Sequence, residues 1–160
     1  MTLRSFALAL LLAVSVPALA SAETHTHAGA KVTFETPDKW SAKPDGDTLQ
    51  ITSPDQGCSI VFVVLSAEDL EKALEAAGKR ITEEVKDLEP DGEAEELEIN
   101  GMKAMVADAK GKVDGKAVDV GFAVVETRSD KALLIFGISD ATKDYEDEVT
   151  AVIKSLKPTK

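Results

Sequence analysis

The sequence predicts an α+β fold in which helices pack on both faces of an antiparallel sheet, a three-layer α/β/α sandwich. Residues 60–65, 120–125 and 133–138 are each apolar on both faces of a possible strand, which is typical of central strands covered on two sides. Asp114-Gly115 lies between two strand-like runs, and this dipeptide favours a two-residue hairpin that makes the flanking strands antiparallel. Two stretches with apolar residues at helical spacing supply the covering helices.

Residues 1–22 have the features of a secretory signal peptide. Arg4 precedes the apolar run Phe6–Val16, and Pro17 and a group of small residues follow that run. This order is typical of a removable signal, whereas a helix that spans a bilayer needs about 20 apolar residues. An uncleaved membrane anchor is therefore the weaker alternative. We expect a periplasmic or secreted mature protein without a membrane span.

The rest of the chain is expected to be one domain behind a short tail. Residues 23–30 are small and polar without periodicity, which predicts a flexible tail. Residues 31–158 have the length of a single α/β domain. The segments expected to be strands are 31–37, 48–53, 58–65, 102–113, 117–127 and 132–139, with a turn-rich loop at 41–47 and an acidic connector at 89–98.

The first helix is expected to begin after Ser66 and to stop before Pro90. Ser66 and Asp69 form an S-x-x-D variant of the capping box, and apolar residues then recur with the helical period. Gly78 costs the helix about 1 kcal/mol. Its presence has two explanations: another group approaches the helix closely there, or the helix simply tolerates the glycine. A second amphipathic helix is expected at 142–156.

The chain is strongly acidic, with 29 Asp and Glu against 18 Lys and Arg and a formal net charge of −11. Removal of residues 1–22 takes away only one base, Arg4, so the mature chain is one unit more negative. Such a surface repels nucleic acid and anionic lipid, which excludes both as partners. We expect a monomer that binds a protein or small-molecule partner in the envelope, or that meets cations or basic partners.

Cys58 is the only cysteine, so no disulfide can form within the chain. It opens an apolar strand-like run, which favours burial as a small apolar residue. The alternative is a disulfide between two molecules, because an odd cysteine in an exported chain can pair in this way.

Phe34, Pro37 and Trp40 form an F-x-x-P-x-x-W motif at the first expected strand, and the closing helix ends in the sequence SLKP at 155–158. With the order of elements between them, this pattern resembles the PsbP-like (Mog-like) superfamily over about residues 31–157, and its bacterial envelope branch in particular. The resemblance implies a compact α/β/α sandwich that usually binds other macromolecules, with no catalytic residues shared across the family. The motif by itself predicts that Phe34 and Trp40 anchor the sheet edge and that Pro37 turns the chain.

The sequence contains no recognisable catalytic constellation. Its only histidines, His25 and His27, lie in the expected tail, which cannot hold a base within reach of a nucleophile. One cysteine and two tail histidines exclude structural zinc of the Cys/His type, and no glycine-rich phosphate-binding motif is present. An enzyme with a carboxylate-only site remains an alternative, and it requires two acids that converge in a buried pocket with raised pKa values.

The acidic run at 89–98 has two interpretations. Its six acids offer the oxygen ligands that calcium prefers, so the run could bind calcium loosely. The acids lack the spacing of an EF-hand loop, and blocks of like charge usually act as solvated connectors. We favour the connector.

The position of the signal cut decides whether a metal site forms at the N-terminus. Cleavage after Ala22 leaves Glu23, Thr24 and His25 as the first three residues. The α-amine, two deprotonated amides and the imidazole then offer four nitrogens in a square, which suits Cu(II) and Ni(II). Cleavage after Ala20 places His25 fifth and removes the site. An ordinary polar tail is the alternative.

We therefore expect an exported, non-enzymatic binding or interaction protein of the cell envelope that uses a sheet edge or a cleft between sheet and helix. No catalytic or cofactor-binding residues are predicted. The second hypothesis is a periplasmic metal-handling protein with the N-terminal Cu(II) or Ni(II) site and His27 as an auxiliary ligand. The third is the carboxylate-only enzyme, such as a hydrolase.

Overall fold

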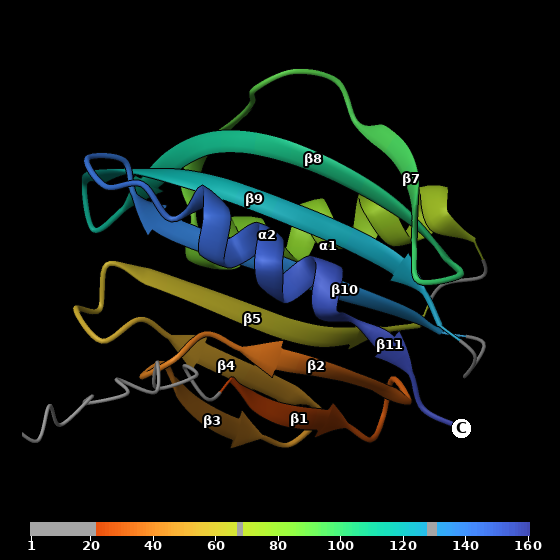
Figure 1. Ribbon diagram of the computed structural model, residues 1–160. Helices are drawn as coiled ribbons and strands as arrows, with labels where there is room; N and C mark the ends of the chain where they lie inside the picture. The colour runs from red at the N-terminus through yellow and green to blue at the C-terminus, as the bar shows by residue number, and fades with distance from the viewer. Residues whose placement is uncertain (1–21, 67–68, 128–130) are drawn as a thin grey trace, which may run out of the picture.

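The computed structural model describes residues 22–66, 69–127 and 131–160 (Figure 1). Strands make up 54% and helices 19% of these residues, so sheet rather than helix forms most of the molecule. None of the helices in these ranges is long and apolar enough to cross a membrane. The elements in chain order are β1 (Glu23–His27), β2 (Val32–Thr36), β3 (Ser41–Asp45), β4 (Thr48–Thr52), β5 (Cys58–Leu65), α1 (Leu70–Glu84), β6 (Lys86–Pro90), β7 (Glu95–Ile99), β8 (Met102–Val113), β9 (Lys116–Glu126), β10 (Ala132–Asp140), α2 (Glu146–Ser155) and β11 (Lys157–Pro158).

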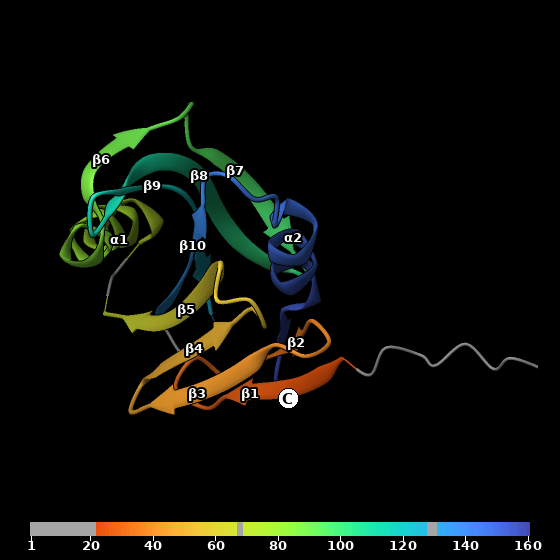
Figure 2. The ribbon, with the colours of Figure 1, turned by 90° about the vertical axis from the view of Figure 1, so that its left-hand side faces the viewer.

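An antiparallel main sheet forms the centre of the molecule. Its order is β3-β4-β5-β10-β9-β8, and β8 carries both β6 and β7 along its outer side (Figures 1 and 2). The three segments predicted to be central strands belong to β5, β9 and β10, and all three are central. The hairpin at Asp114-Gly115 is also confirmed, because φ values of 50° and 79° fit the left-handed two-residue turn between β8 and β9.

Helix α1 covers one face of the main sheet. Ala73, Ala77 and Ile81 recur at four-residue spacing and are fully buried in the core on that face. No atom lies within 4 Å of the position that a Cβ on Gly78 would take. The helix therefore tolerates this glycine, and no other group approaches it closely.

Both ends of α1 differ from the prediction. The helix is capped by Asp69 and not by Ser66, because an Asp69 carboxylate oxygen accepts a hydrogen bond from the Lys72 amide at 2.8 Å. It ends at Glu84, short of the predicted end near the proline. Val85 is buried there, and the chain then pairs as β6 with β8.

Two segments predicted to be irregular are largely strands. The turn-rich loop at 41–47 contains β3, and the acidic connector at 89–98 contains the end of β6 and most of β7. Pairing with a neighbouring strand outweighs turn residues and charge in these segments. Helix α2 is shorter than the predicted 142–156, because the Asp140 carboxylate holds Thr142 in a turn through the backbone amide and the hydroxyl.

The predicted three-layer α/β/α sandwich is wrong, because helices alone do not cover the second face of the main sheet. A three-stranded sheet, β1-β2-β11, covers much of this face, and the short helix α2 covers the remainder (Figure 2). β2 contributes Val32 and Phe34 to the core on this side, while α2 and its C-cap contribute Val152 and Leu156. The layers are therefore α1, the main sheet, and a mixed layer of strands and one helix.

The predicted flexible tail at 23–30 is also wrong. Residues 23–27 form β1, which pairs along its whole length with β2. His27 is only 6% exposed: its Nδ1 accepts a hydrogen bond from the Ala30 amide at 3.3 Å, and its Nε2 donates to the Asp47 carbonyl at 3.0 Å. The pairing with β2 and the bonds of His27 order a segment that has no periodicity of its own. The predicted signal peptide lies, except for its last residue, outside the described residues.

The F-x-x-P-x-x-W motif joins the small sheet to the core. Phe34 is buried and stacks on Phe62 of β5, with ring centroids 4.1 Å apart. Trp40 is half-buried and meets the Tyr145 ring edge-on at 6.4 Å. The Trp40 amide donates to the Pro37 carbonyl at 3.2 Å, so the chain turns at Pro37 as predicted.

Cys58 is free and 1% exposed, which confirms the predicted burial. Burial, together with the charges of Glu148 and Asp55, raises the pKa of its thiol to about 12. A thiol with such a pKa is a poor nucleophile at neutral pH. The structure therefore disfavours the intermolecular disulfide.

His27→Ala should lower the free energy of unfolding by about 1–3 kcal/mol, because the Ala30 amide and the Asp47 carbonyl each lose a buried partner. Urea denaturation measures this change. Thr26→Ala is the matched control, since Thr26 is an exposed residue of the same strand. Equal, small effects of the two substitutions would show that residues 23–30 do not belong to the cooperative fold.

Candidate functional site

An open groove of about 1150 Å³ runs between α2 and the strands β7, β8 and β9. We call it the α2 groove. Tyr145, Val149 and Ile153 line it from the α2 side, and Leu97 lines it from β7. Leu97 is 37% exposed and is the only large apolar residue of the described ranges that is classed as exposed. The groove therefore presents uncovered apolar surface on the side of the main sheet opposite α1.

Two glycines lie side by side beneath α2. The strand register aligns one residue from each of four adjacent strands, namely Asp108, Gly121, Gly137 and Ile60. A Cβ on Gly137 would lie 3.7 Å from Val149, so this glycine lets α2 lie close to the sheet. A Cβ on Gly121 would have the Asp108 carboxylate, at 3.4 Å, as its only neighbour within 4 Å. The missing side chain at Gly121 therefore leaves free space in the floor of the groove.

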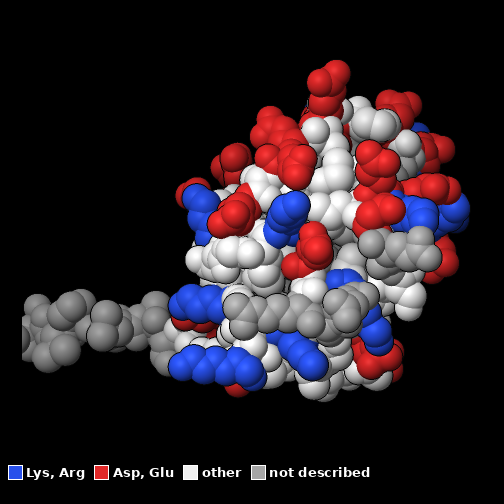
Figure 3. Space-filling view, turned by 90° about the vertical axis from the view of Figure 1, so that its right-hand side faces the viewer, with Lys and Arg blue, Asp and Glu red and all other residues white. Residues whose placement is uncertain are grey.

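Acidic side chains surround this floor. Eight of them line the groove: Asp91, Glu93, Glu95, Glu98, Asp108, Asp119, Asp144 and Glu146. Three lysines also line the groove. Lys110 is paired with Asp91 at 2.6 Å and Lys143 with Asp55 at 2.8 Å, so Lys154 is the one lining lysine without an ion pair among the described residues. Figure 3 shows mostly acidic side chains, with a few basic ones among them, over the half of the molecule that carries β7 and β8, whereas basic side chains are more frequent over the opposite half. The groove is therefore a negative region of the surface.

Asp108 shows the effect of this charge. The surrounding groove removes water from its carboxylate, and this desolvation raises the pKa of Asp108 above its ordinary value. The charges of Asp91, Glu95 and Asp119 raise the pKa further. The fold thus holds a carboxylate whose ionised form it disfavours, and such groups are often kept for function rather than stability.

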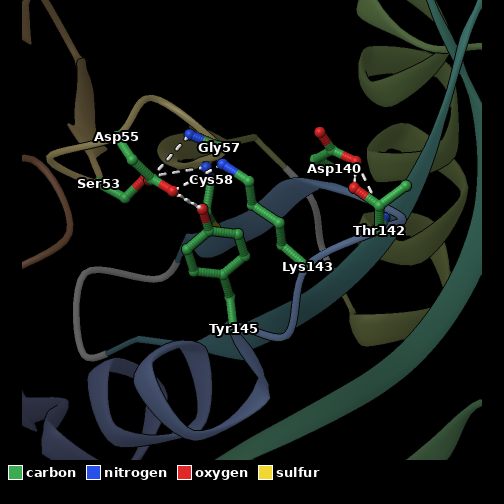
Figure 4. Close-up of polar contacts among 8 residues, drawn as sticks. All are labelled: Ser53, Asp55, Gly57, Cys58, Asp140, Thr142, Lys143 and Tyr145. Atoms are coloured by element: carbon green, nitrogen blue, oxygen red, sulfur yellow. Dashed lines mark hydrogen bonds and ion pairs between the residues drawn. The ribbon is translucent and has the colours of Figure 1, made fainter.

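A polar cluster around Asp55 holds the N-terminal end of α2. Asp55 lies in the turn between β4 and β5, and it accepts hydrogen bonds from the Lys143 ammonium at 2.8 Å and the Tyr145 hydroxyl at 2.7 Å (Figure 4). The Ser53 hydroxyl at 2.7 Å and the Gly57 amide at 3.1 Å donate to it from its own turn. These donors, Lys143 first, hold the pKa of Asp55 well below its ordinary value.

Asn100 holds the other end of α2. Its side-chain amide donates to the carbonyls of Lys154 at 3.0 Å and Leu156 at 2.6 Å, groups that a helix end leaves without partners. Asn100 and Gly101 form the predicted turn between β7 and β8, with φ values of 48° and 85°. One residue thus makes the hairpin and caps the helix. Since both ends of α2 are fixed, its middle forms a defined wall of the groove.

The residues predicted to bind copper or nickel lie outside the groove. Glu23, Thr24 and His25 are extended and paired with β2, and the His25 ring stacks 5.6 Å from Phe34. A square of four nitrogens needs the amides of Thr24 and His25 turned toward one ion, so metal capture would have to unpair this end of β1. His27, the auxiliary ligand, has both ring nitrogens in hydrogen bonds. The metal site stays a prediction, and no group of three His, Cys, Asp or Glu in the described ranges is placed to hold a metal ion.

The sequence analysis missed the groove, although one signal for it is present. A glycine inside an apolar strand often marks a bulge or a close approach by another group, and Gly121 and Gly137 both interrupt such strands. Their alignment beside Asp108 depends on the register of three strands, which no local pattern contains. Asp108 and Asp119 look like ordinary polar positions of strands in the sequence.

Asp108→Asn should raise the free energy of unfolding at pH 7, because a neutral amide avoids the desolvation and repulsion that the carboxylate meets. The pKa of Asp108 is higher in the folded state than in the unfolded state. The advantage of the variant is therefore full above the raised pKa and disappears as the pH falls below the unfolded value of about 4. Urea denaturation at pH 4 and pH 7 measures it, and an equal advantage at both values would contradict this account.

Asp55→Asn should act with the opposite sign and lower the stability at pH 7. The folded pKa of Asp55 is depressed, so its contribution is present above the unfolded pKa of about 4 and is lost as the pH falls toward the folded value. Thermal denaturation from pH 7 downward should show the two proteins converging in acid. Asp45→Asn, which removes an exposed charge at the end of β3, is the control and should produce no such convergence.

Solved structures share this architecture at low sequence identity. Cyanobacterial PsbP (CyanoP) from Synechocystis aligns with a TM-score of 0.61 and 13% identity, over 92% of this chain and 98% of that chain. LpqN of Mycobacterium tuberculosis, described as involved in cell envelope biogenesis, aligns with a TM-score of 0.60 and 16% identity, over 88% of this chain and 91% of its own. A protein of Bacteroides thetaiotaomicron aligns with a TM-score of 0.62 and 13% identity, over 87% of this chain. The present chain spans about half of that protein, 49% of its length.

No family model and no curated protein matches the sequence. At identities of 13% to 16%, the fold is what these structures have in common. The alignments with PsbP and LpqN extend over 92% and 88% of the chain. The chain has the PsbP-like fold.

Proposed function

We propose that this chain is an exported, non-enzymatic binding protein of the cell envelope and that the α2 groove is its binding site. The observation that carries the proposal is an open groove whose walls bear Leu97, Val149 and Ile153 and whose floor lacks a side chain at Gly121. Ligand sites are typically concave and mostly apolar, with a few polar groups that orient the ligand. The groove is concave and has apolar walls, and the eight acids and three lysines that line it supply polar groups.

Two further observations support the proposed location in the cell envelope. Residues 1–22 have the charge, apolar core and small residues of a removable export signal. LpqN, whose fold this chain shares, is involved in cell envelope biogenesis. An envelope location is consistent with both.

A carboxylate-only enzyme is the competing function, and the raised pKa of Asp108 favours it. General acid–base work by two carboxylates needs a site in which burial separates their pKa values. Asp108 is exposed in an open groove, so this condition is not met and binding is the better account. If substrate turnover disappeared in Asp108→Asn while the groove still bound its ligand, the enzyme would become the better account and binding the weaker one.

Gly121→Val should abolish binding in the groove while the protein stays folded. The backbone at Gly121 does not adopt a left-handed conformation, and valine suits a strand, so the new side chain fills the floor without strain. Pull-downs from an envelope extract at native salt, read by mass spectrometry, should show that ligands of the wild type are lost from this variant.

Gly78→Ala is the matched control for this experiment. Gly78 lies on α1, across the main sheet from the groove, and nothing surrounds its Cβ position. This variant should retain every ligand of the wild type. Capture of the same ligands by all three proteins would place the binding site elsewhere.

A further inference from the structure

We propose that the α2 groove binds an extended segment of a partner protein whose groove-facing row of side chains includes both basic residues (lysine or arginine) and apolar ones. The inference rests on the proposed function and adds to it the chemistry of the partner. Three features of the groove support it: three acids without an ion-pair partner, apolar surface between them, and a free strand edge at β7.

Three acids of the groove have no ion-pair partner in the part of the chain that the structure describes. Within the described ranges, Glu95, Asp108 and Asp119 form no ion pair with a lysine or arginine. Lys110, which also lines the groove, is paired with Asp91. The remaining acids repel one another, and the charges of Glu95 and Asp119 are among the causes of the raised pKa of Asp108. A cationic ligand relieves this repulsion, whereas an anionic ligand adds to it.

The floor and walls require apolar side chains as well. Gly121 and Val106 lie in the floor between the acids, and Leu97 and Val149 lie on the two walls. A small polyamine would leave this surface exposed to water, and a purely apolar molecule would leave the acids unpaired. Val106 and Asp108 are two residues apart in β8, so apolar residues and acids share one face of the main sheet. A strand added at β7 satisfies both when the row of side chains that faces the groove, every second residue, includes basic and apolar ones.

The edge of β7 favours an extended ligand over a helical one. β7 pairs with β8 on one side, and no other strand of the described ranges pairs with its outer edge. A free edge offers backbone donors and acceptors to an added strand, a common mode of peptide recognition. β7 itself brings an acid, Glu95, and an apolar residue, Leu97, to the groove.

Fluorescence anisotropy with a labelled lysine–valine peptide that repeats Lys-Lys-Val-Val, so that each face of its strand carries both residue types, tests the proposal. Two peptides of equal length are the controls: a Lys-Lys-Ser-Ser repeat keeps the charge, and a Glu-Glu-Val-Val repeat keeps the apolar side chains. The lysine–valine peptide should bind at least about ten-fold more tightly than either control, and its affinity should fall as salt rises.

Two sets of variants separate charge from shape. The groove triple variant Glu95→Gln, Asp108→Asn, Asp119→Asn should weaken binding by about ten-fold or more. The matched triple Glu71→Gln, Glu75→Gln, Glu83→Gln removes the same charge from the exposed face of α1 and should weaken it less than about two-fold, since distant exposed charges are screened. Gly121→Val, which keeps all charges, should also lose the peptide.

The outcomes distinguish failure of the proposed partner chemistry from failure of the proposed binding site. Equal weakening by both triple variants would show general attraction to an acidic protein and would overturn the proposal. Loss of envelope ligands in Gly121→Val, with no effect of the groove triple, would retain the binding site and reject a basic partner. Insensitivity to Gly121→Val would reject the site itself. Peptide binding should also slow amide hydrogen exchange in β7, and binding without that slowing would rule out strand addition.

Discussion

Helix α2 is fixed over the main sheet by polar contacts at its two ends, and the geometry of the second face depends on them. Asp55 holds the approach to the helix and Asn100 holds its last carbonyls. Both residues sit in tight turns of the main sheet, so two hairpins set the position of the helix. Gly57 also contributes to these contacts: a Cβ there would overlap the Tyr145 hydroxyl, so the glycine lets Tyr145 reach Asp55. Core packing through Val152 then completes an arrangement that the turns define.

The groove that results carries features that weaken the fold. A glycine within a strand loses side-chain packing, and Gly121 has little around it to compensate. Asp108 adds a carboxylate whose charge the folded state disfavours. Natural proteins generally accept such costs where a surface has a task besides stability. That two of them coincide at one place, beside exposed Leu97, is a physical reason to locate function there.

The predictable part of the fold is the part that local patterns determine. Apolar runs identify the central strands, and Asp114-Gly115 identifies a hairpin, because both signals lie within a few residues. β1 escaped prediction because its order comes from β2 and from the bonds of His27 to Ala30 and Asp47. The mixed second layer and the groove were not predicted for the same reason: both depend on contacts between parts of the chain that are distant in sequence. Whether a strand or a helix covers a sheet face, and which residues align across strands, are properties of the assembled chain.

Buried Cys58 leaves the surface of the described residues without a thiol, because it is the only cysteine of the chain. Burial keeps reagents away from its thiol and raises the pKa of that thiol, so very little reactive thiolate is present at pH 7. A maleimide dye or a thiol-specific spin label would therefore not react with Cys58 in the folded protein. A cysteine introduced at Leu97, on the wall of the groove, becomes the single reactive position, so probes can report on the groove in a protein whose core is left intact.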